Sequence, residues 1–131
     1  MSDTPTAKPV ALVIEDDDMT AMIIQTILEQ EGYEVQIAVD GEKAQQMIAR
    51  MPPPALVTLD IMLPYIDGFE LLDLIRSAPD WQDVPVLVVT SKTEPQVLAR
   101  ALNSGASDCL VKPFRRQDLC AQIKRLTGVI A

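Results

Sequence analysis

The chain contains no histidine and only two cysteines among its 131 residues. Without an imidazole, it can have neither a histidine general base, nor a Ser-His-Asp triad, nor a histidine-ligated metal. Two cysteines do not suggest a disulfide framework, and we interpret Cys109 and Cys120 as small apolar fillers rather than reactive thiols. Histidine-based catalysis and stabilisation by a disulfide framework are therefore set aside.

Long hydrophobic runs and excess positive charge are also lacking. No apolar run approaches about 18 residues, so we expect no membrane span. Residues 1–9 are polar, include Asp3 and lack the apolar core of a signal peptide, so we interpret them as a flexible N-terminal tail. A cytoplasmic location follows by default. Eleven basic against 19 acidic residues give a net charge of −8, which argues against non-specific binding to nucleic acid or anionic membranes.

What the chain does contain is a regular alternation of two patterns. Its length and its 48% hydrophobic content suit one folded domain, which we place at residues 10–128. Short apolar runs typical of strands buried on both faces alternate with segments of helical spacing. The predicted strands are residues 10–14, 34–39, 55–59, 84–89 and 109–111. This pattern predicts an α/β fold, with helices on both faces of a five-stranded parallel sheet.

Capping residues mark where several of the helices are expected to begin. Asp18 is predicted to cap the first helix, and Asp67 to cap the third with Glu70. Thr93 and Gln96 form a similar pair before the fourth helix.

The first helix is expected to have two distinct faces. Its predicted core stripe consists of Ile23, Ile24, Ile27 and Leu28. Met19 and Met22 fall on a neighbouring face, and they either widen the core stripe or contact a partner.

Polar side chains follow four of the predicted strands, at the point where each strand ends. Glu15 and Asp16 follow the first strand, Asp60 the third, and Lys112 the fifth. Thr90 follows the fourth. Because ligands collect at the carboxyl ends of strands in open parallel sheets, we expect these side chains to converge. Carboxylates suit Mg²⁺, and a carboxylate can also attack phosphorus to form an acyl phosphate.

The motifs at these strand ends closely resemble the receiver domain of bacterial response regulators. The resemblance covers roughly residues 9–127 and implies a flavodoxin-like (βα)5 fold with strand order 2-1-3-4-5. The matching pieces are residues 12–17 (LVIEDD), 59–64 (LDIMLP), 67–69 (DGF), 88–91 (VVTS), 105–108 (GASD) and 110–114 (LVKPF).

The resemblance implies a role for each of these polar residues. Asp60 would be the phosphoacceptor, and Glu15 and Asp16 would form the acid pocket for Mg²⁺. The backbone carbonyl of Met62 would complete the metal coordination. Among the remaining positions, Thr90 would be the switch hydroxyl.

The fifth strand would supply the basic partner, since Lys112 would pair with the phosphoryl group. Because the chain itself cannot carry phosphohistidine, the resemblance implies an external donor: a histidine kinase, a phosphotransfer protein or a small acyl phosphate. The output surface would consist of the fourth helix, fifth strand and fifth helix, and a homodimer is compatible with it. The chain itself is expected to bind no nucleic acid.

Three other functions remain open. The chain could be the N-terminal receiver of a longer DNA-binding regulator, or a receiver-like module that binds partners without phosphorylation. Phosphatases of the haloacid dehalogenase type also use an Asp after a strand, but they place a second Asp two residues later. Met62 stands at that position here, so we expect no enzyme activity beyond self-catalysed phosphotransfer and autodephosphorylation.

Several positions depart from the family pattern. Tyr65 replaces the glycine that is usual after Leu-Pro. Cys109 stands where many receivers place an aromatic residue that moves with the threonine. Met62 and Lys92 occupy the positions that, in this family, tune the lifetime of the phosphoryl group.

Overall fold

The structure is a computed structural model that describes residues 8–63 and 66–128. The tail was predicted at residues 1–9, and its residues 1–7 lie outside the described part of the chain. Tyr65 also lies outside it. Lys8 and Pro9, which precede the first strand, are exposed.

Five strands alternate with five helices within the described residues. Every predicted strand is present, with boundaries that differ by at most two residues. The elements are β1 (Val10–Ile14), α1 (Asp18–Gln30), β2 (Glu34–Ala38), α2 (Gly41–Arg50), β3 (Leu56–Leu59), α3 (Gly68–Ser77), β4 (Val86–Thr90), α4 (Pro95–Asn103), β5 (Asp108–Val111) and α5 (Arg116–Thr127).

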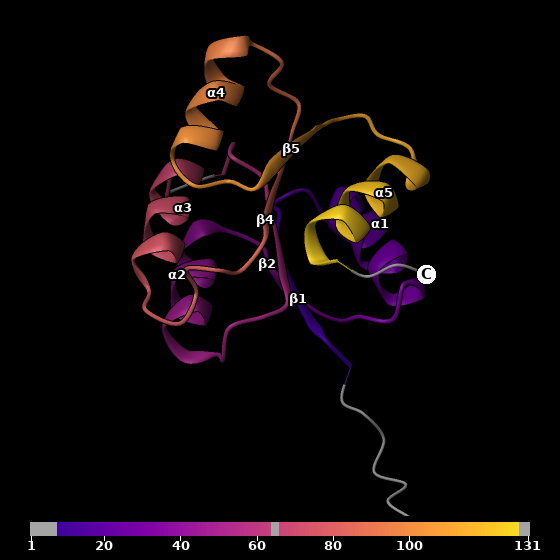
Figure 1. Cartoon of the computed structure of the whole chain (residues 1–131), viewed down its shortest axis with the longest axis horizontal. Coiled ribbons are helices and arrows are strands. Elements are labelled where there is room, and N and C mark those ends of the chain that lie inside the picture. The colour runs from indigo at the N-terminus through magenta and orange to yellow at the C-terminus, as the bar shows by residue number, and fades with distance from the viewer. Residues whose placement is uncertain (1–7, 64–65, 129–131) are drawn as a thin grey trace, which may run out of the picture.

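The strands form one parallel sheet in the order β2-β1-β3-β4-β5. In Figure 1, α1 and α5 lie on one side of this sheet, and α2, α3 and α4 lie on the other. Two buried clusters match these layers, one drawing on α2, α3 and α4 and the other on α1 and α5. The predicted doubly wound fold is therefore confirmed.

Central strands are buried along their whole length because helices cover both of their faces. All residues of β3 and β4 are buried, whereas β2, at the edge, alternates between exposed and partly buried positions before its buried last residue, Ala38. Neighbouring residues of β4 pack into different clusters, Val88 with the α3 and α4 side and Val89 with the α1 and α5 side. The same alternation determines on which face of the sheet each side chain at a strand end lies.

Two predicted helix caps are wrong. The N-cap of α1 is Asp17, which has extended backbone angles (φ −83°, ψ 115°) and accepts the N–H of Thr20, while Asp18 is already helical. Helix α4 has Glu94 at the cap with no side-chain hydrogen bond. Because Pro95 opens this helix, the chain before it is extended, and the Thr93 and Gln96 pairing is not formed.

The core stripe of α1 is narrower than predicted. Ile24, Ile27 and Leu28 are buried, but Ile23 is 48% exposed. Each helical residue turns by about 100°, which carries Ile23 to the edge of the face centred on Ile24 and Leu28. Asp67, in contrast, does cap α3 by accepting the N–H of Phe69.

The sequence predicts no membrane-spanning segment, and the lengths of the helices can be compared with that expectation. Among the described segments, no helix combines the length and the apolar character that crossing a membrane requires.

Candidate functional site

The strand ends of β1 and β3 place the first two acids side by side. Ile14 and Leu59 are partners in the parallel register, so Glu15 and Asp60 follow on adjacent strands. The backbone N–H of Asp60 donates to the carbonyl of Ile14 at 3.0 Å, which extends the sheet by one step. The positions of these carboxylates are therefore set by the sheet rather than by a free loop.

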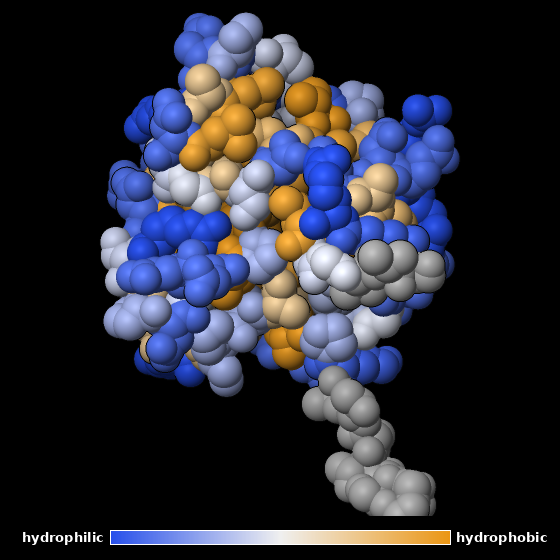
Figure 2. Space-filling model, in the orientation of Figure 1, coloured by the Kyte–Doolittle hydropathy of each residue, from blue (hydrophilic) through white to orange (hydrophobic). Residues whose placement is uncertain are grey.

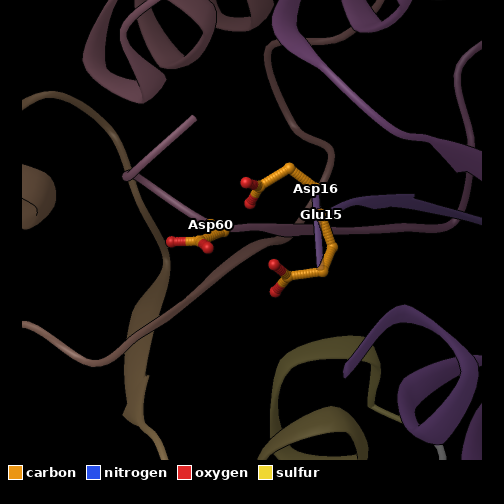
Figure 3. A group of neighbouring side chains, drawn as sticks. All are labelled: Glu15, Asp16 and Asp60. Carbon is orange, nitrogen blue, oxygen red and sulfur yellow. The ribbon is translucent and has the colours of Figure 1, made fainter. Parts of the chain in front are cut away.

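Three carboxylates gather at this edge of the sheet, as Figure 3 shows. Glu15, Asp16 and Asp60 each offer an oxygen within 4.8 Å of the others. Glu15 and Asp60 are buried, whereas Asp16 is exposed. The cluster is thus buried on the sheet side and open toward solvent on the side of Asp16.

Lys112 supplies the positive charge for this acidic cluster. Its Nζ donates to Glu15 Oε1 at 2.7 Å and to Asp60 Oδ2 at 3.2 Å. Burial alone would lower the pKa of Lys112, but the Glu15 hydrogen bond and the charges of Asp60 and Glu15 raise it above its usual value. The lysine therefore remains charged at neutral pH.

Glu15 has a strongly perturbed pKa. Burial raises the pKa of Glu15 to about 7, although the hydrogen bond from Lys112 opposes that shift. The nearby charge of Asp60 raises the pKa further. A carboxylate with a strongly perturbed pKa and a specific charged partner is typical of functional sites.

Backbone donors hold both buried carboxylates in place. The N–H of Met62 donates to Asp60 Oδ1 at 3.0 Å, and the N–H of Asp17 donates to Glu15 Oε2 at 3.2 Å. Met62 therefore contacts Asp60 through its backbone N–H, while its side chain is 52% exposed. The role of its carbonyl in coordination stays a prediction.

Thr90 ends β4 beside this site but is fully buried. Its hydroxyl accepts the backbone N–H of Lys92 at 3.1 Å. The alternation along β4 directs Thr90 to the side of α3 and α4, whereas Lys112 packs with Glu15 and Asp60. The structure thus brings together the side chains of Glu15, Asp16, Asp60 and Lys112, and it places Thr90 at the end of the adjacent strand β4, on the side of α3 and α4.

The donor set fits a hard divalent cation. Mg²⁺ prefers oxygen ligands and keeps several waters, and three carboxylates with one open side meet that requirement. The close ion pair between Glu15 and Lys112 was not expected from the sequence. A signal for it exists, because a buried acid next to a strand end requires a cationic partner.

Comparison with known proteins agrees with this fold and site. A family model described as the response regulator receiver domain matches residues 11–124. The chain therefore belongs to the response regulator receiver domain family.

Two curated relatives illustrate the sequence similarity. The DNA-binding dual master transcriptional regulator RpaA of Synechocystis sp. is 37% identical over 118 residues, which cover 90% of this chain and 48% of the relative. Response regulator MprA of Mycobacterium leprae is 39% identical over 115 residues, covering 88% of this chain and 49% of the relative. The chain thus spans about half the length of these relatives.

Two solved structures illustrate the structural similarity. One is the receiver domain of sensor histidine kinase PA1611 from Pseudomonas aeruginosa PAO1, solved with a magnesium ion coordinated in its active-site cleft. It has a TM-score of 0.84 and 28% identity, covering 94% of this chain and all (100%) of the other. The other is a CheY-like receiver domain protein from Methanospirillum hungatei JF-1, with a TM-score of 0.85 and 29% identity over 93% of this chain and 95% of the other.

Proposed function

We propose that this chain is a phosphorylation-dependent receiver in which Asp60 accepts a phosphoryl group from a histidine kinase or a phosphotransfer protein. The observation that carries the proposal is the double contact of Lys112 with Glu15 and Asp60 beside the exposed carboxylate of Asp16. It combines a nucleophile, a cation and hard metal ligands at one edge of the sheet.

Phosphotransfer requires an oxygen nucleophile and compensation of negative charge. A carboxylate oxygen of Asp60 attacks phosphorus and forms an acyl phosphate, while the P–N or P–O bond of the donor breaks and the donor keeps the electron pair. Lys112 then pairs with the added phosphoryl oxygens, and the Thr90 hydroxyl moves toward them. Bound by Asp16, Asp60 and the Met62 carbonyl, with Glu15 acting through water, Mg²⁺ would offset the charge that develops during transfer.

The proposed reaction stops at a self-catalysed transfer and a slow hydrolysis. Turnover on external phosphoesters needs a general acid near the leaving group, and Met62 offers none two residues after Asp60. The receiver is therefore proposed as a phosphoacceptor, not as a phosphatase.

The kinase is proposed to dock beside the site on α1 and the loop after Lys112. Met19 and Met22 are 72% and 65% exposed, so they are free to contact a partner. A largely apolar hollow of about 360 Å³ lies between α1 and the loop after Lys112, although neither methionine lines it. It is lined by Thr20, Ile23, Ser91, Lys112, Pro113 and Phe114.

The output surface is proposed to comprise α4, β5 and α5. Hydrophobic colour gathers in Figure 2 over the part of the molecule where α4 lies, and Leu102 of that helix is 48% exposed. Since Thr90 leads directly into the segment before α4, a movement of its hydroxyl would reach this surface first. A homodimer through this surface is part of the proposal.

Phosphorylation with acetyl phosphate tests the proposal directly. The wild-type chain, incubated with acetyl phosphate and Mg²⁺, should gain the mass of one phosphoryl group by intact mass spectrometry. Asp60→Asn should gain none, and EDTA should suppress the gain in the wild type. Asp67→Asn is a matched control, since Asp67 only caps α3, and it should be labelled normally. Labelling of Asp60→Asn would overturn the assignment.

A second candidate concerns the context of the receiver. The relatives are about twice as long as the matched region, and one is named a DNA-binding transcriptional regulator. This favours the chain acting as the receiver of a longer DNA-binding regulator. Determining whether the natural reading frame continues past Ala131 into a basic DNA-binding domain tests this candidate. A receiver-like module that binds partners without phosphorylation remains the outcome if the wild-type chain is not labelled.

A further inference from the structure

Helix α4 is held unevenly along its length. At its N-terminal end, Thr93 to Gln96 are exposed and the cap makes no side-chain hydrogen bond. Ala101, in its second half, is the one residue of α4 that is buried. The end of the helix that follows Thr90 is therefore the loose end.

The C-terminal end of α4 is fixed to α3 by Arg76. The Nε of Arg76 donates to the carbonyl of Gly105 at 2.8 Å, and another nitrogen of its guanidinium donates to the carbonyl of Val84 at 2.8 Å. Gly105 has φ +112°, and a Cβ there would lie 2.6 Å from Arg76 Cγ. This close contact joins the chain after α4 to the connection before β4, so it forms a fixed point about which α4 can turn.

The phosphoacceptor loop is tied rigidly to Phe69 on α3. The carbonyl of Ile61, directly after Asp60, accepts the N–H of Gly68 at 3.1 Å. A Cβ on Gly68 would lie 2.5 Å from Ile61 Cα, so the two backbones are in direct contact. Phe69 follows Gly68, and its position is therefore set by the backbone next to Asp60.

Arg100 of α4 lies on this same Phe69. The guanidinium carbon is 3.9 Å from the centroid of the Phe69 ring, which is a cation–π contact. Phe69 also belongs to the buried cluster that contains Ala101 and Val88, against which Val97 and Cys109 pack. The contact therefore links α4 to the phosphoacceptor loop by a route that does not pass through Thr90.

We propose that Phe69 and Arg100 form a latch that holds α4 in its resting position and reports the state of the Asp60 loop to it. The proposal rests on the proposed phosphoacceptor function. Cys109 is too small to act as the aromatic switch of β5, whereas Phe69 belongs to the buried cluster against which Cys109 packs and is the aromatic residue that Arg100 contacts. Phosphorylation shifts the backbone after Asp60, moves the ring with it, and releases Arg100, so that α4 turns about Gly105.

The size of the effect follows from the strength of the contact. A cation–π pair at an exposed site changes an equilibrium by about twofold to fivefold. A phosphoryl group or its mimic must shift the equilibrium between the resting and the turned position of α4. Loss of the latch raises the resting population of the turned position by about twofold to fivefold, so activation should need less ligand by the same factor. The unphosphorylated helix should also open more often.

Arg100→Gln tests the latch with little risk to folding, since Arg100 is exposed and glutamine has a similar helix propensity. In the unphosphorylated protein, amide hydrogen exchange at Leu98 and its neighbours should become about twofold to fivefold faster, with α5 unchanged. With Mg²⁺ and beryllofluoride, a phosphoryl mimic, the concentration for half-conversion of the α4 amide signals should fall by about the same factor.

Two further variants sharpen the result. Arg50→Gln removes the same charge from an exposed position on α2 and should change neither measurement. Phe69→Leu combined with Arg100→Gln should free α4 no more than Phe69→Leu alone, because the pair acts as a unit. Additive effects, or a response of Arg100→Gln equal to that of Arg50→Gln, would overturn the latch while leaving phosphorylation of Asp60 intact. Failure of the wild type to respond to beryllofluoride would instead overturn the function on which the latch rests.

Discussion

Thr58 is the side chain in the described residues whose buried polar atom has no hydrogen-bond partner. It lies in the middle of β3, between Val13 of β1 and Leu87 of β4. Both strand neighbours are apolar, so their side chains offer the hydroxyl no acceptor. Leaving a buried hydroxyl unpaired costs about 1–3 kcal/mol.

Thr58→Val should therefore stabilise the protein. Valine keeps the branched shape and removes the hydroxyl, so we expect the free energy of unfolding to rise by about 1 kcal/mol. Urea denaturation with an unchanged m-value is the measurement. Thr58→Ser keeps the hydroxyl and loses a methyl group, and it should destabilise by a similar amount. A loss of stability in the valine variant would show that the hydroxyl has a partner in solution.

We expect Met62 to prolong the lifetime of a phosphoryl group on Asp60. Its side chain is exposed beside Asp60 and offers no group to orient an attacking water. Met62→Asn should shorten the lifetime of the acyl phosphate, because an amide can hold a water in line with the phosphorus. The decay of the phosphorylated mass after removal of acetyl phosphate measures it. The control is Met22→Asn, at another exposed methionine, whose acyl phosphate should decay as slowly as that of the wild type. Equal lifetimes of the acyl phosphate in all three proteins would contradict the prediction.

At the residue scale, the sequence predicted which side chains meet but not how they pair. Residues that end parallel strands must come to one edge, so the meeting of Glu15, Asp60 and Lys112 follows from strand order. The tighter contact of Lys112 with Glu15 depends on which rotamers the buried site allows. Arg100 and Phe69 carry no local signal for their contact, because it depends on how α3 and α4 pack.

Helix α1 has a buried face that packs in the core and an exposed face that we propose contacts the kinase. Its buried side is formed by Ala21, Ile24, Ile27 and Leu28. Its exposed side carries Met19 and Met22, next to the half-exposed Ile23. The wider core stripe that the sequence left open is therefore not formed.

Substitution of both methionines by glutamine should separate docking from stability. Glutamine has nearly the same helix propensity as methionine, and both sites are exposed, so the melting temperature should stay within about 2 °C of the wild type. Labelling by acetyl phosphate should also be retained, because the site is untouched. Phosphotransfer from the partner kinase should fall. Gln25→Ala with Glu29→Ala, on the same helix, is the control, and unimpaired transfer in the methionine variant would place docking elsewhere.

At the element scale, helix and strand identities were predictable and their exact starts were not. Apolar runs and periodic stripes determine which elements exist, because burial on two faces or one requires those patterns. Three consecutive aspartates at residues 16–18 suit an N-cap, and only the local backbone selects Asp17. Before α4, the constraint from Pro95 outweighs the side-chain pattern of Thr93 and Gln96.

The whole molecule carries a net charge of −8 and concentrates three carboxylates at one edge of its sheet. Its layers follow from the alternation of strand and helix, but the order β2-β1-β3-β4-β5 came from family resemblance rather than from residue patterns. Several strand orders bury the same apolar runs, which is why pattern alone does not select one. Repulsion among these three carboxylates lowers the stability of the folded state, because only the folded chain brings them together.

Mg²⁺ should therefore stabilise the folded protein. A ligand that binds only the native state at ten times its dissociation constant adds about 1.4 kcal/mol, which corresponds to a rise in melting temperature on the order of 5 °C for a chain of this size. Asp16→Ala should remove most of that rise, because it deletes the exposed ligand of the cluster. Asp17→Ala should lower the melting temperature without metal, since the cap of α1 is lost, yet keep the rise with Mg²⁺. Thermal melts of the three proteins, with EDTA or with increasing Mg²⁺, provide the measurement. Equal losses of the Mg²⁺ response in both variants would show that the acidic segment attracts the cation by its charge alone and that no defined site exists.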